Sequence, residues 1–185
     1  MRIIGGRSRG LHLAPVGAGD SAAHLRPTSD RVREAILNLL INGGYGDPVT
    51  DARVLDLFAG TGALGLEAIS RGADSALLVD DGAAAIALQR RNIALMRTEA
   101  ATILRRSALQ LGVVVGAPYD LVFLDPPYGK GMGEAALKSA LAGGWLAPDA
   151  LVVWEESAAP LVPAGMAMLD QRRYGDTLVT ILRAP

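Results

Sequence analysis

The sequence contains no cysteine and only two histidines, His12 and His24, among 185 residues. Without cysteine the protein forms no disulfide and has no thiol nucleophile. Because the two histidines stand apart in the chain, we expect no metal site. The chemistry therefore has to rest on carboxylates, backbone groups and an organic cofactor.

Long apolar runs are also lacking. No stretch reaches the roughly 18 consecutive apolar residues that a membrane span requires, and residues 1–7 do not resemble a signal peptide. We therefore expect no membrane span and a cytoplasmic location. Half of the residues are nevertheless hydrophobic, which is enough to bury the core of one compact domain.

Positive charge is scarce and unevenly placed. The net charge is −1, yet the first 34 residues hold six arginines against three acidic residues. An exposed cluster of this kind predicts contact with phosphate groups, whereas the alternative is an arginine-rich surface that is merely solvated. The candidate arginines are Arg2, Arg7, Arg9, Arg26, Arg31 and Arg33.

The first part of the chain differs from the rest in pattern. Apolar segments at 2–4 and 11–13 flank a glycine- and arginine-rich loop, which predicts a small basic β-hairpin. A Gly/Pro/Ala-rich connector follows, and Thr28 or Ser29 then stands where a helix cap is expected. We predict an N-terminal extension and linker over 1–25, and a catalytic domain over 26–185.

Beyond residue 53, apolar strands and helices alternate. This alternation predicts an α/β fold with a doubly wound, mostly parallel sheet, because parallel strands are joined by helical crossovers. The last two segments have no room for a helix between them and predict an antiparallel hairpin at the sheet edge. The expected seven strands are 54–58, 76–79, 102–104, 121–124, 151–154, 166–172 and 177–182, and the expected helices are 64–71, 83–96 and 134–142.

The first candidate site is a glycine loop between a strand and a helix. Gly60 and Gly62 allow a ligand to approach the backbone, and the following helix offers free N–H groups. With Gly65 these residues also fit the dinucleotide-binding pattern. Asp56 favours a different ligand, because its carboxylate repels a pyrophosphate but attracts an ammonium group. The candidate cofactor contacts here are Asp56, Phe58, Ala59, Gly60, Thr61 and Gly62.

Two further positions are candidates for the same cofactor. Asp80 lies about 20 residues beyond the glycine loop, where an acid can accept hydrogen bonds from ribose hydroxyls. Asp81 follows at once, but strand alternation favours Asp80 as the residue that points into the crevice. Ser107 and Ala108 follow the third strand and are candidates for contact with an adenine.

The third candidate site is Asp125-Pro126-Pro127-Tyr128, directly after a buried strand. The two prolines donate no hydrogen bond and fix an extended turn, so that carbonyl oxygens are exposed at the sheet edge. An exocyclic amine of a nucleobase is a poor nucleophile. The Asp125 carboxylate and the Pro126 carbonyl can accept from both of its N–H groups and orient it toward a methyl donor, while Tyr128 stacks on the base.

The order of the two motifs, Asp56-Leu57-Phe58-Ala59-Gly60-Thr61-Gly62 and then Asp125 to Tyr128, resembles the Rossmann-like amino-methyltransferases. Three further blocks resemble, more specifically, the bacterial 16S rRNA guanine-N2 methyltransferase family. They begin at Arg2-Ile3-Ile4-Gly5-Gly6, at Arg26-Pro27-Thr28-Ser29-Asp30 and at Gly62-Ala63-Leu64-Gly65. The resemblance extends over most of the chain.

The resemblance implies S-adenosylmethionine as the cofactor and a guanine of 16S rRNA, within a partly assembled small subunit, as the substrate. The excess of arginine near the N-terminus predicts that the six candidate arginines contact this RNA, and we expect a monomer. Ser107 departs from the family pattern, in which Asp or Asn is common, and Gly82 replaces a longer residue. The alternatives are a DNA adenine or cytosine amino-methyltransferase and a non-catalytic RNA-binding assembly factor.

Overall fold

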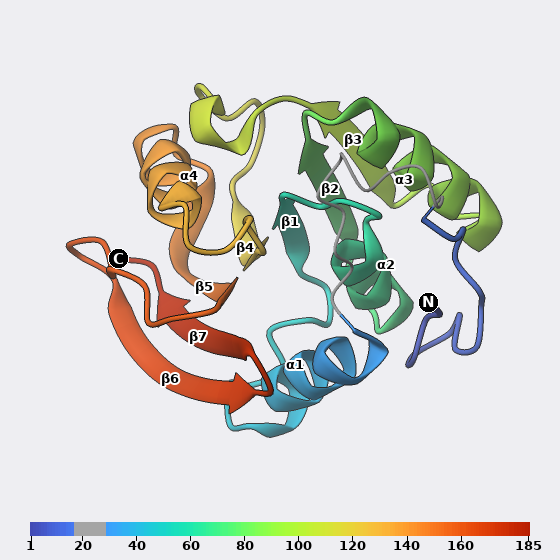
Figure 1. The fold of residues 1–185 in the computed structure, drawn as a ribbon, viewed down its shortest axis with the longest axis horizontal. Helices are drawn as coiled ribbons and strands as arrows, with labels where there is room; N and C mark the ends of the chain where they lie inside the picture. The colour runs from blue at the N-terminus through green and yellow to red at the C-terminus, as the bar shows by residue number, and fades with distance from the viewer. Residues whose placement is uncertain (17–28) are drawn as a thin grey trace.

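The computed structural model describes residues 1–16 and 29–185. Its centre is one seven-stranded sheet in the order β3-β2-β1-β4-β5-β7-β6 (Figure 1). The first five strands in the chain pair in parallel, and β7 runs antiparallel to both β5 and β6. This arrangement confirms the predicted doubly wound α/β fold of the Rossmann-like methyltransferase type, with an antiparallel hairpin at one edge.

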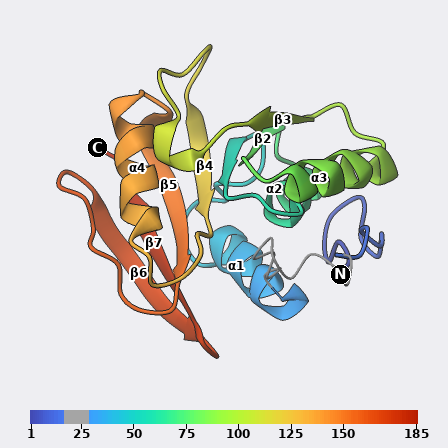
Figure 2. The same cartoon turned by 45° about the horizontal axis from the view of Figure 1, so that its top comes forward.

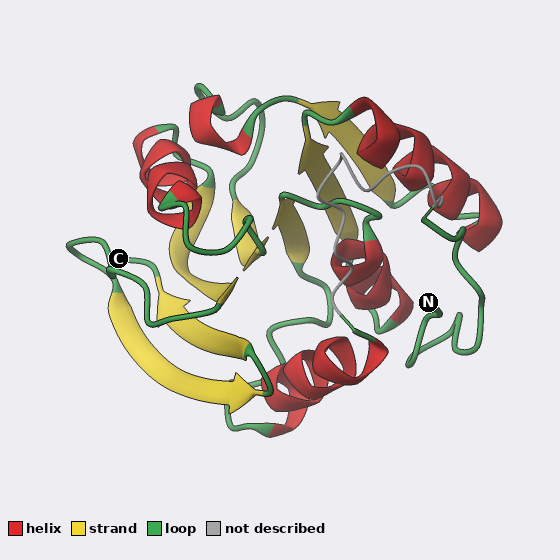
Figure 3. Ribbon diagram, in the orientation of Figure 1, coloured by secondary structure: helices red, strands yellow, loops and turns green. Residues whose placement is uncertain are grey.

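The elements alternate along the chain as predicted (Figure 3). The strands are β1 (Arg53–Leu57), β2 (Ser75–Asp80), β3 (Ala101–Arg105), β4 (Tyr119–Leu124), β5 (Leu146–Glu156), β6 (Ala167–Tyr174) and β7 (Thr177–Arg183). The helices are α1 (Asp30–Asn42), α2 (Ala63–Ser70), α3 (Ala83–Met96) and α4 (Met132–Ala142), with a short 3-10 helix η2 (Ala108–Gln110).

Two hydrophobic clusters cover the two faces of the sheet. One contains residues of α1, α2 and α3 packed on Phe123 and Val153, and the other contains residues of α4 and η2 packed on Leu124 and Trp154. Figure 2 accordingly shows α1 and α4 on either side of β5. Because side chains alternate along a strand, neighbouring positions of β4 and β5 face different clusters.

Helix α1 begins where the sequence predicts. Ser29 is its N-cap, and the Ser29 hydroxyl accepts a hydrogen bond from the Val32 amide. The other candidate cap, Thr28, and the predicted boundary between the extension and the catalytic domain lie outside the described residues. Among the described residues, no helix is long and apolar enough to cross a membrane.

The predicted N-terminal hairpin forms one antiparallel bridge, between Arg2 and His12, instead of two strands. Ile3 donates to the Leu11 carbonyl, and both Ile3 and Leu13 are buried in the cluster of α1 and α2. The pairing stops because the amides of Ile4 and Gly5 bond to the Glu67 carboxylate of α2. The basic loop is therefore docked on α2.

Candidate active site

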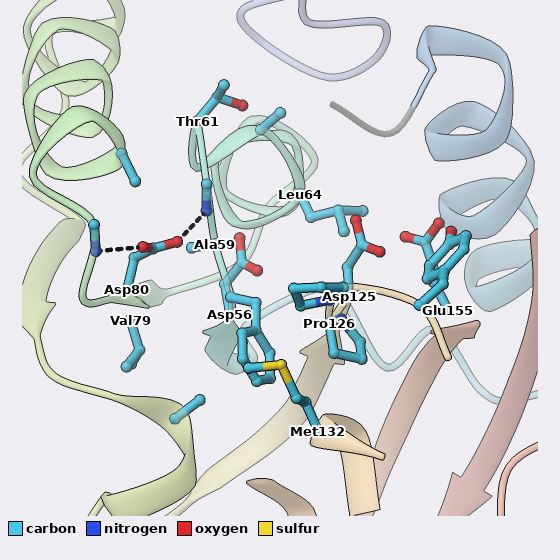
Figure 4. A pocket seen from close by; sticks show the side chains of 18 of the residues that line it. Asp56, Ala59, Thr61, Leu64, Val79, Asp80, Asp125, Pro126, Met132 and Glu155 are labelled. Carbon is cyan, nitrogen blue, oxygen red and sulfur yellow. Dashed lines mark hydrogen bonds between the residues drawn. The ribbon is translucent and has the colours of Figure 1, made fainter. Parts of the chain in front are cut away.

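The carboxyl ends of β1, β2, β4 and β5 surround a cavity of about 940 Å³ (Figure 4). This is the edge of a parallel sheet where ligands bind in doubly wound folds. The cavity brings together the glycine loop, the end of β2, the start of η2 and the turn after β4. All of the predicted cofactor and catalytic residues line it except Gly62, which caps α2.

The glycine loop has an unusual backbone. Phe58, Gly60 and Gly62 all have positive φ angles, of 59°, 52° and 77°. Such a conformation is costly for Phe58, which has a side chain, and strain of this kind is concentrated at functional sites. The loop therefore has to be held by its surroundings.

Asp80 provides part of that support. Its Oδ2 accepts a hydrogen bond from the Gly60 amide and its Oδ1 accepts one from the Gly82 amide, each at 2.9 Å. A carboxylate has about four acceptor positions, so two remain for ligand hydroxyls. Asp81 also lines the cavity but is exposed to solvent. The choice of Asp80 over Asp81 as the ribose contact stays a prediction.

Helix α3 supports the same loop, which the sequence reasoning missed. The Gln89 side-chain amide donates to the Gly60 carbonyl at 3.1 Å, and the Asn92 amide donates to the Thr61 carbonyl at 2.8 Å. Asn92 also accepts from the Ala14 amide. The sequence did contain a sign of this support. Gln89 and Asn92 lie one turn apart on the face of α3 that also carries the apolar residues Ile86 and Met96.

Asp56 lies at the floor of the cavity and is 1% exposed. Burial, together with the nearby Asp125 and Asp80, raises the pKa of its carboxyl to about 7, against the opposing effect of a hydrogen bond from the Gly65 amide. A cation beside this carboxyl would favour its ionised form. The environment of Asp56 therefore fits a positively charged ligand.

The turn after β4 forms the opposite wall. Asp125, Pro126, Pro127 and Tyr128 all line the cavity, and the Tyr128 hydroxyl is 3.2 Å from the Thr177 hydroxyl. Burial raises the Tyr128 pKa to about 12, so the phenol stays neutral at physiological pH. The hydrogen bond with Thr177 fixes the ring at the mouth of the turn, where it can stack on a planar ligand.

Glu155 is a cavity residue that the sequence reasoning missed. The predicted strand 151–154 ends two residues too early, because β5 is paired with β7 as far as Glu156. Glu155 is 1% exposed and lines the cavity next to Asp125 (Figure 4). The indication in the sequence was an acidic pair at the carboxyl end of a buried strand.

The cavity as a whole is acidic. Among the described residues that line it, Lys130 is the one cation. The acids are Asp56, Asp80, Asp81, Asp125, Glu155 and Asp176. This charge opposes the phosphates of a dinucleotide and suits a ligand that carries positive charge. Ser107 and Ala108 line the far end, where the Ser107 hydroxyl accepts from the Leu109 amide.

The predicted RNA-contacting arginines divide into three groups. Arg2, Arg7, Arg9 and Arg31 are exposed. Arg26 lies outside the described residues. The prediction for Arg33 is wrong, because its side chain is fully buried, donates to the Arg2 carbonyl and to Asp30, and pairs with Glu67 at 3.6 Å.

Glu67 organises the docking of the basic loop. Its two oxygens accept from the amides of Ile4 and Gly5 at 2.8 and 2.7 Å and also pair with Arg33 and Arg71. The buried carboxylate of Glu67 thereby holds the N-terminal loop and α1 against α2, which is the helix that follows the glycine loop.

Comparison with known proteins agrees with this architecture. The chain is 39% identical to Ribosomal RNA small subunit methyltransferase D of Escherichia coli, and the match covers 95% of this chain and 85% of that protein. It is 35% identical to Putative rRNA methyltransferase YlbH of Bacillus subtilis, and that match covers 99% of this chain and 98% of the relative. The structure of Putative methyltransferase yhhF from Escherichia coli aligns with a TM-score of 0.82 at 33% identity and covers 100% of this chain and 97% of that one. The model of the family described as Conserved hypothetical protein 95 matches residues 1–183, so the chain belongs to that family of methyltransferases.

Proposed function

We propose that the protein transfers a methyl group from S-adenosylmethionine to the N2 amine of a guanine in 16S rRNA. The observation that carries this proposal is the acidic cavity in which the Asp125 to Tyr128 turn faces the glycine loop. The names of the relatives, which refer to ribosomal RNA, support the substrate class. An rRNA substrate would place the protein in the cytoplasm.

The residues present fit S-adenosylmethionine, which supplies an electrophilic methyl group on a positively charged sulfur. Asp56 and the acidic wall suit the charge of its sulfonium and ammonium groups. The two remaining acceptor positions of Asp80 suit ribose hydroxyls. Ser107 and Ala108 would adjoin the adenine. A cavity of about 940 Å³ also leaves room for a base.

The chemistry follows from the acceptors at the end of β4. The Asp125 carboxylate and the Pro126 carbonyl accept the two N–H groups of the amine and direct its nitrogen toward the methyl group. The nitrogen would gain the methyl as the bond between that methyl and the cofactor sulfur breaks, and it would lose one proton to Asp125, which passes it to water. Tyr128 holds the base by stacking, and the proline turn limits the access of water.

The exposed arginines Arg2, Arg7, Arg9 and Arg31 suit contact with the RNA backbone, because the cavity itself repels phosphates. We propose that the substrate is the small subunit or an assembly intermediate of it. The monomeric state expected from the sequence stays a prediction.

A deletion strain tests the proposal. Mass spectrometry of its 16S rRNA nucleosides should show the loss of N2-methylguanosine at one position, and the wild-type gene, but not Asp125→Ala, should restore it. Unchanged rRNA with a lost DNA N6-methyladenine or N4-methylcytosine would support the DNA enzyme instead. Unchanged nucleosides combined with a defect in subunit assembly would support the non-catalytic factor.

A further inference from the structure

Glu155 is a buried carboxylate in the cavity for which the chemistry above has no task. Neighbouring parallel strands place it beside the catalytic turn, because Leu124 of β4 pairs with Trp154 of β5. Asp125 and Glu155 are the next residues along the two strands. They therefore occupy equivalent positions at the edge where the base is expected.

Side-chain alternation places both carboxylates on one side of the sheet. Leu124 and Trp154 pack in the cluster of α4, so the following residues turn to the opposite face. Figure 4 shows the side chains of Asp125 and Glu155 next to each other at the cavity wall. Glu155 contributes to the electrostatic environment of Tyr128, together with Asp125. The three groups thus share one region of the cavity.

Two adjacent carboxylates match one nucleobase in particular. Guanine presents two neighbouring kinds of donor on its Watson–Crick edge, the N1–H and the 2-amino group. Adenine and cytosine each present an amine next to a ring nitrogen that only accepts. A carboxylate accepts hydrogen bonds and donates none, so a second acceptor beside Asp125 favours guanine and opposes the other two bases.

We propose that Glu155 is the residue that selects guanine, by accepting a hydrogen bond from its N1–H while Asp125 and the Pro126 carbonyl engage the 2-amino group. This inference rests on the proposed guanine-N2 methylation and adds the determinant of its specificity. The burial of Glu155 strengthens the selection, because a base that turns a ring-nitrogen lone pair toward a buried carboxylate is repelled by its charge and leaves that nitrogen without a donor.

2-Aminopurine separates the two roles, because it keeps the 2-amino group but has an accepting nitrogen at position 1. The guanine that the wild-type protein methylates is first mapped in 16S rRNA. Semi-synthetic small subunits then carry either guanine or 2-aminopurine at that position. Single-turnover methyl transfer is measured on both substrates with the wild type, Glu155→Gln, Glu155→Asp and the exposed control Glu99→Gln.

The quantity compared is the ratio of the two rates within each variant. The different intrinsic reactivity of the two amines cancels between variants, and so does any loss of folded protein. The side-chain amide of Glu155→Gln can donate to position 1, so its guanine preference should fall at least about 10-fold below that of the wild type. Glu155→Asp keeps a carboxylate and should keep the preference, as should Glu99→Gln.

A Glu155→Gln ratio within about twofold of the wild-type ratio would overturn the inference, because a purely structural role lowers both rates together. A wild type that transfers no methyl group to guanine would instead contradict the proposed function. The two failures are therefore distinguishable in one experiment.

Discussion

Asp125 is the residue on which the proposed chemistry depends most. Asp125→Ala should lower the single-turnover rate of methyl transfer by about 100- to 1000-fold, because it removes an oriented acceptor that acts in the transition state. Calorimetry should find the affinity for S-adenosylmethionine little changed. Asp74→Ala, an exposed acid in the turn before β2, is the control. A variant that keeps most of its rate would exclude this role.

The raised pKa of the Asp56 carboxyl predicts that the stability of the folded protein depends on pH. Its folded-state pKa of about 7 lies above the ordinary value of 3.8, so the stabilising contribution is complete below that ordinary value and is lost as the pH rises toward 7. The loss is about 4 kcal/mol at most. Asp56→Asn keeps an acceptor for the Gly65 amide and cannot ionise. It should therefore gain stability relative to the wild type between pH 4 and pH 8.

Urea unfolding of both proteins in the absence of ligand measures this difference at several pH values. Subtracting one from the other removes the contributions of the titrating groups that do not interact with Asp56. If the difference in unfolding free energy were the same at pH 4 and pH 8, the raised pKa of Asp56 would be wrong.

Single residues also mark where sequence reasoning succeeds. The sequence predicts Asp80 and Asp125 because each follows an apolar strand, and Asp56 because it precedes the glycine loop; all three line one cavity. The prediction for Arg33 is wrong, since its position among exposed arginines does not reveal that its own face of α1 packs on α2. Local sequence gives the chemistry of a side chain, but its burial depends on distant partners.

The connection between α1, α2 and the N-terminal loop depends on Glu67. Glu67→Ala leaves the buried Arg33 without this partner and the amides of Ile4 and Gly5 without an acceptor. The unfolding free energy should fall by about 3–5 kcal/mol. Hydrogen exchange should accelerate most at those two amides. Glu34→Ala, on the exposed face of α1, should change stability by less than about 0.5 kcal/mol.

The docked loop is expected to bind RNA. Replacing both Arg7 and Arg9 with alanine should weaken rRNA binding and reduce the log–log salt slope by about 0.7–0.9 for each phosphate that the protein no longer neutralises. Affinity for S-adenosylmethionine should stay unchanged. Arg183→Ala is the control, because Arg183 is exposed at the end of β7, where it pairs with Leu151 of β5 and not with the N-terminal loop. Equal slopes for both variants would leave the loop a structural role only.

At the level of elements, the sequence predicts order better than extent. The helix over 83–96 agrees with α3 in both bounds, because its apolar pattern starts and stops sharply. The predicted strand 151–154 misses seven residues of β5, and Glu155 is one of the seven. Leu146 pairs with Tyr119 of β4, and Glu155 and Glu156 pair with β7, whereas residues 147–150 lie where the register with β4 shifts. These pairings with distant segments are not visible in the local sequence.

For the whole molecule, the acidic cavity predicts selective stabilisation by a cationic ligand. S-adenosylmethionine at 100 times its Kd should stabilise the folded protein by about 2.7 kcal/mol, which corresponds to a rise in Tm of about 5–11 °C for a chain of this size. NAD at the same concentration should produce no shift. A thermal unfolding series with both ligands makes the comparison, and a larger shift with NAD would contradict the cofactor assignment.

The first 14 residues have a further consequence for how the chain is synthesised. Ile4 is 63 residues away from its partner Glu67, and Ala14 is 78 residues away from its partner Asn92. The loop therefore emerges from the ribosome well before the helices that receive it, and has to wait unpaired until α3 has been translated. Strand β1 waits in the same way for its second neighbour β4, because Val54 pairs with Leu121. The earliest segments of the nascent chain are therefore completed by later ones.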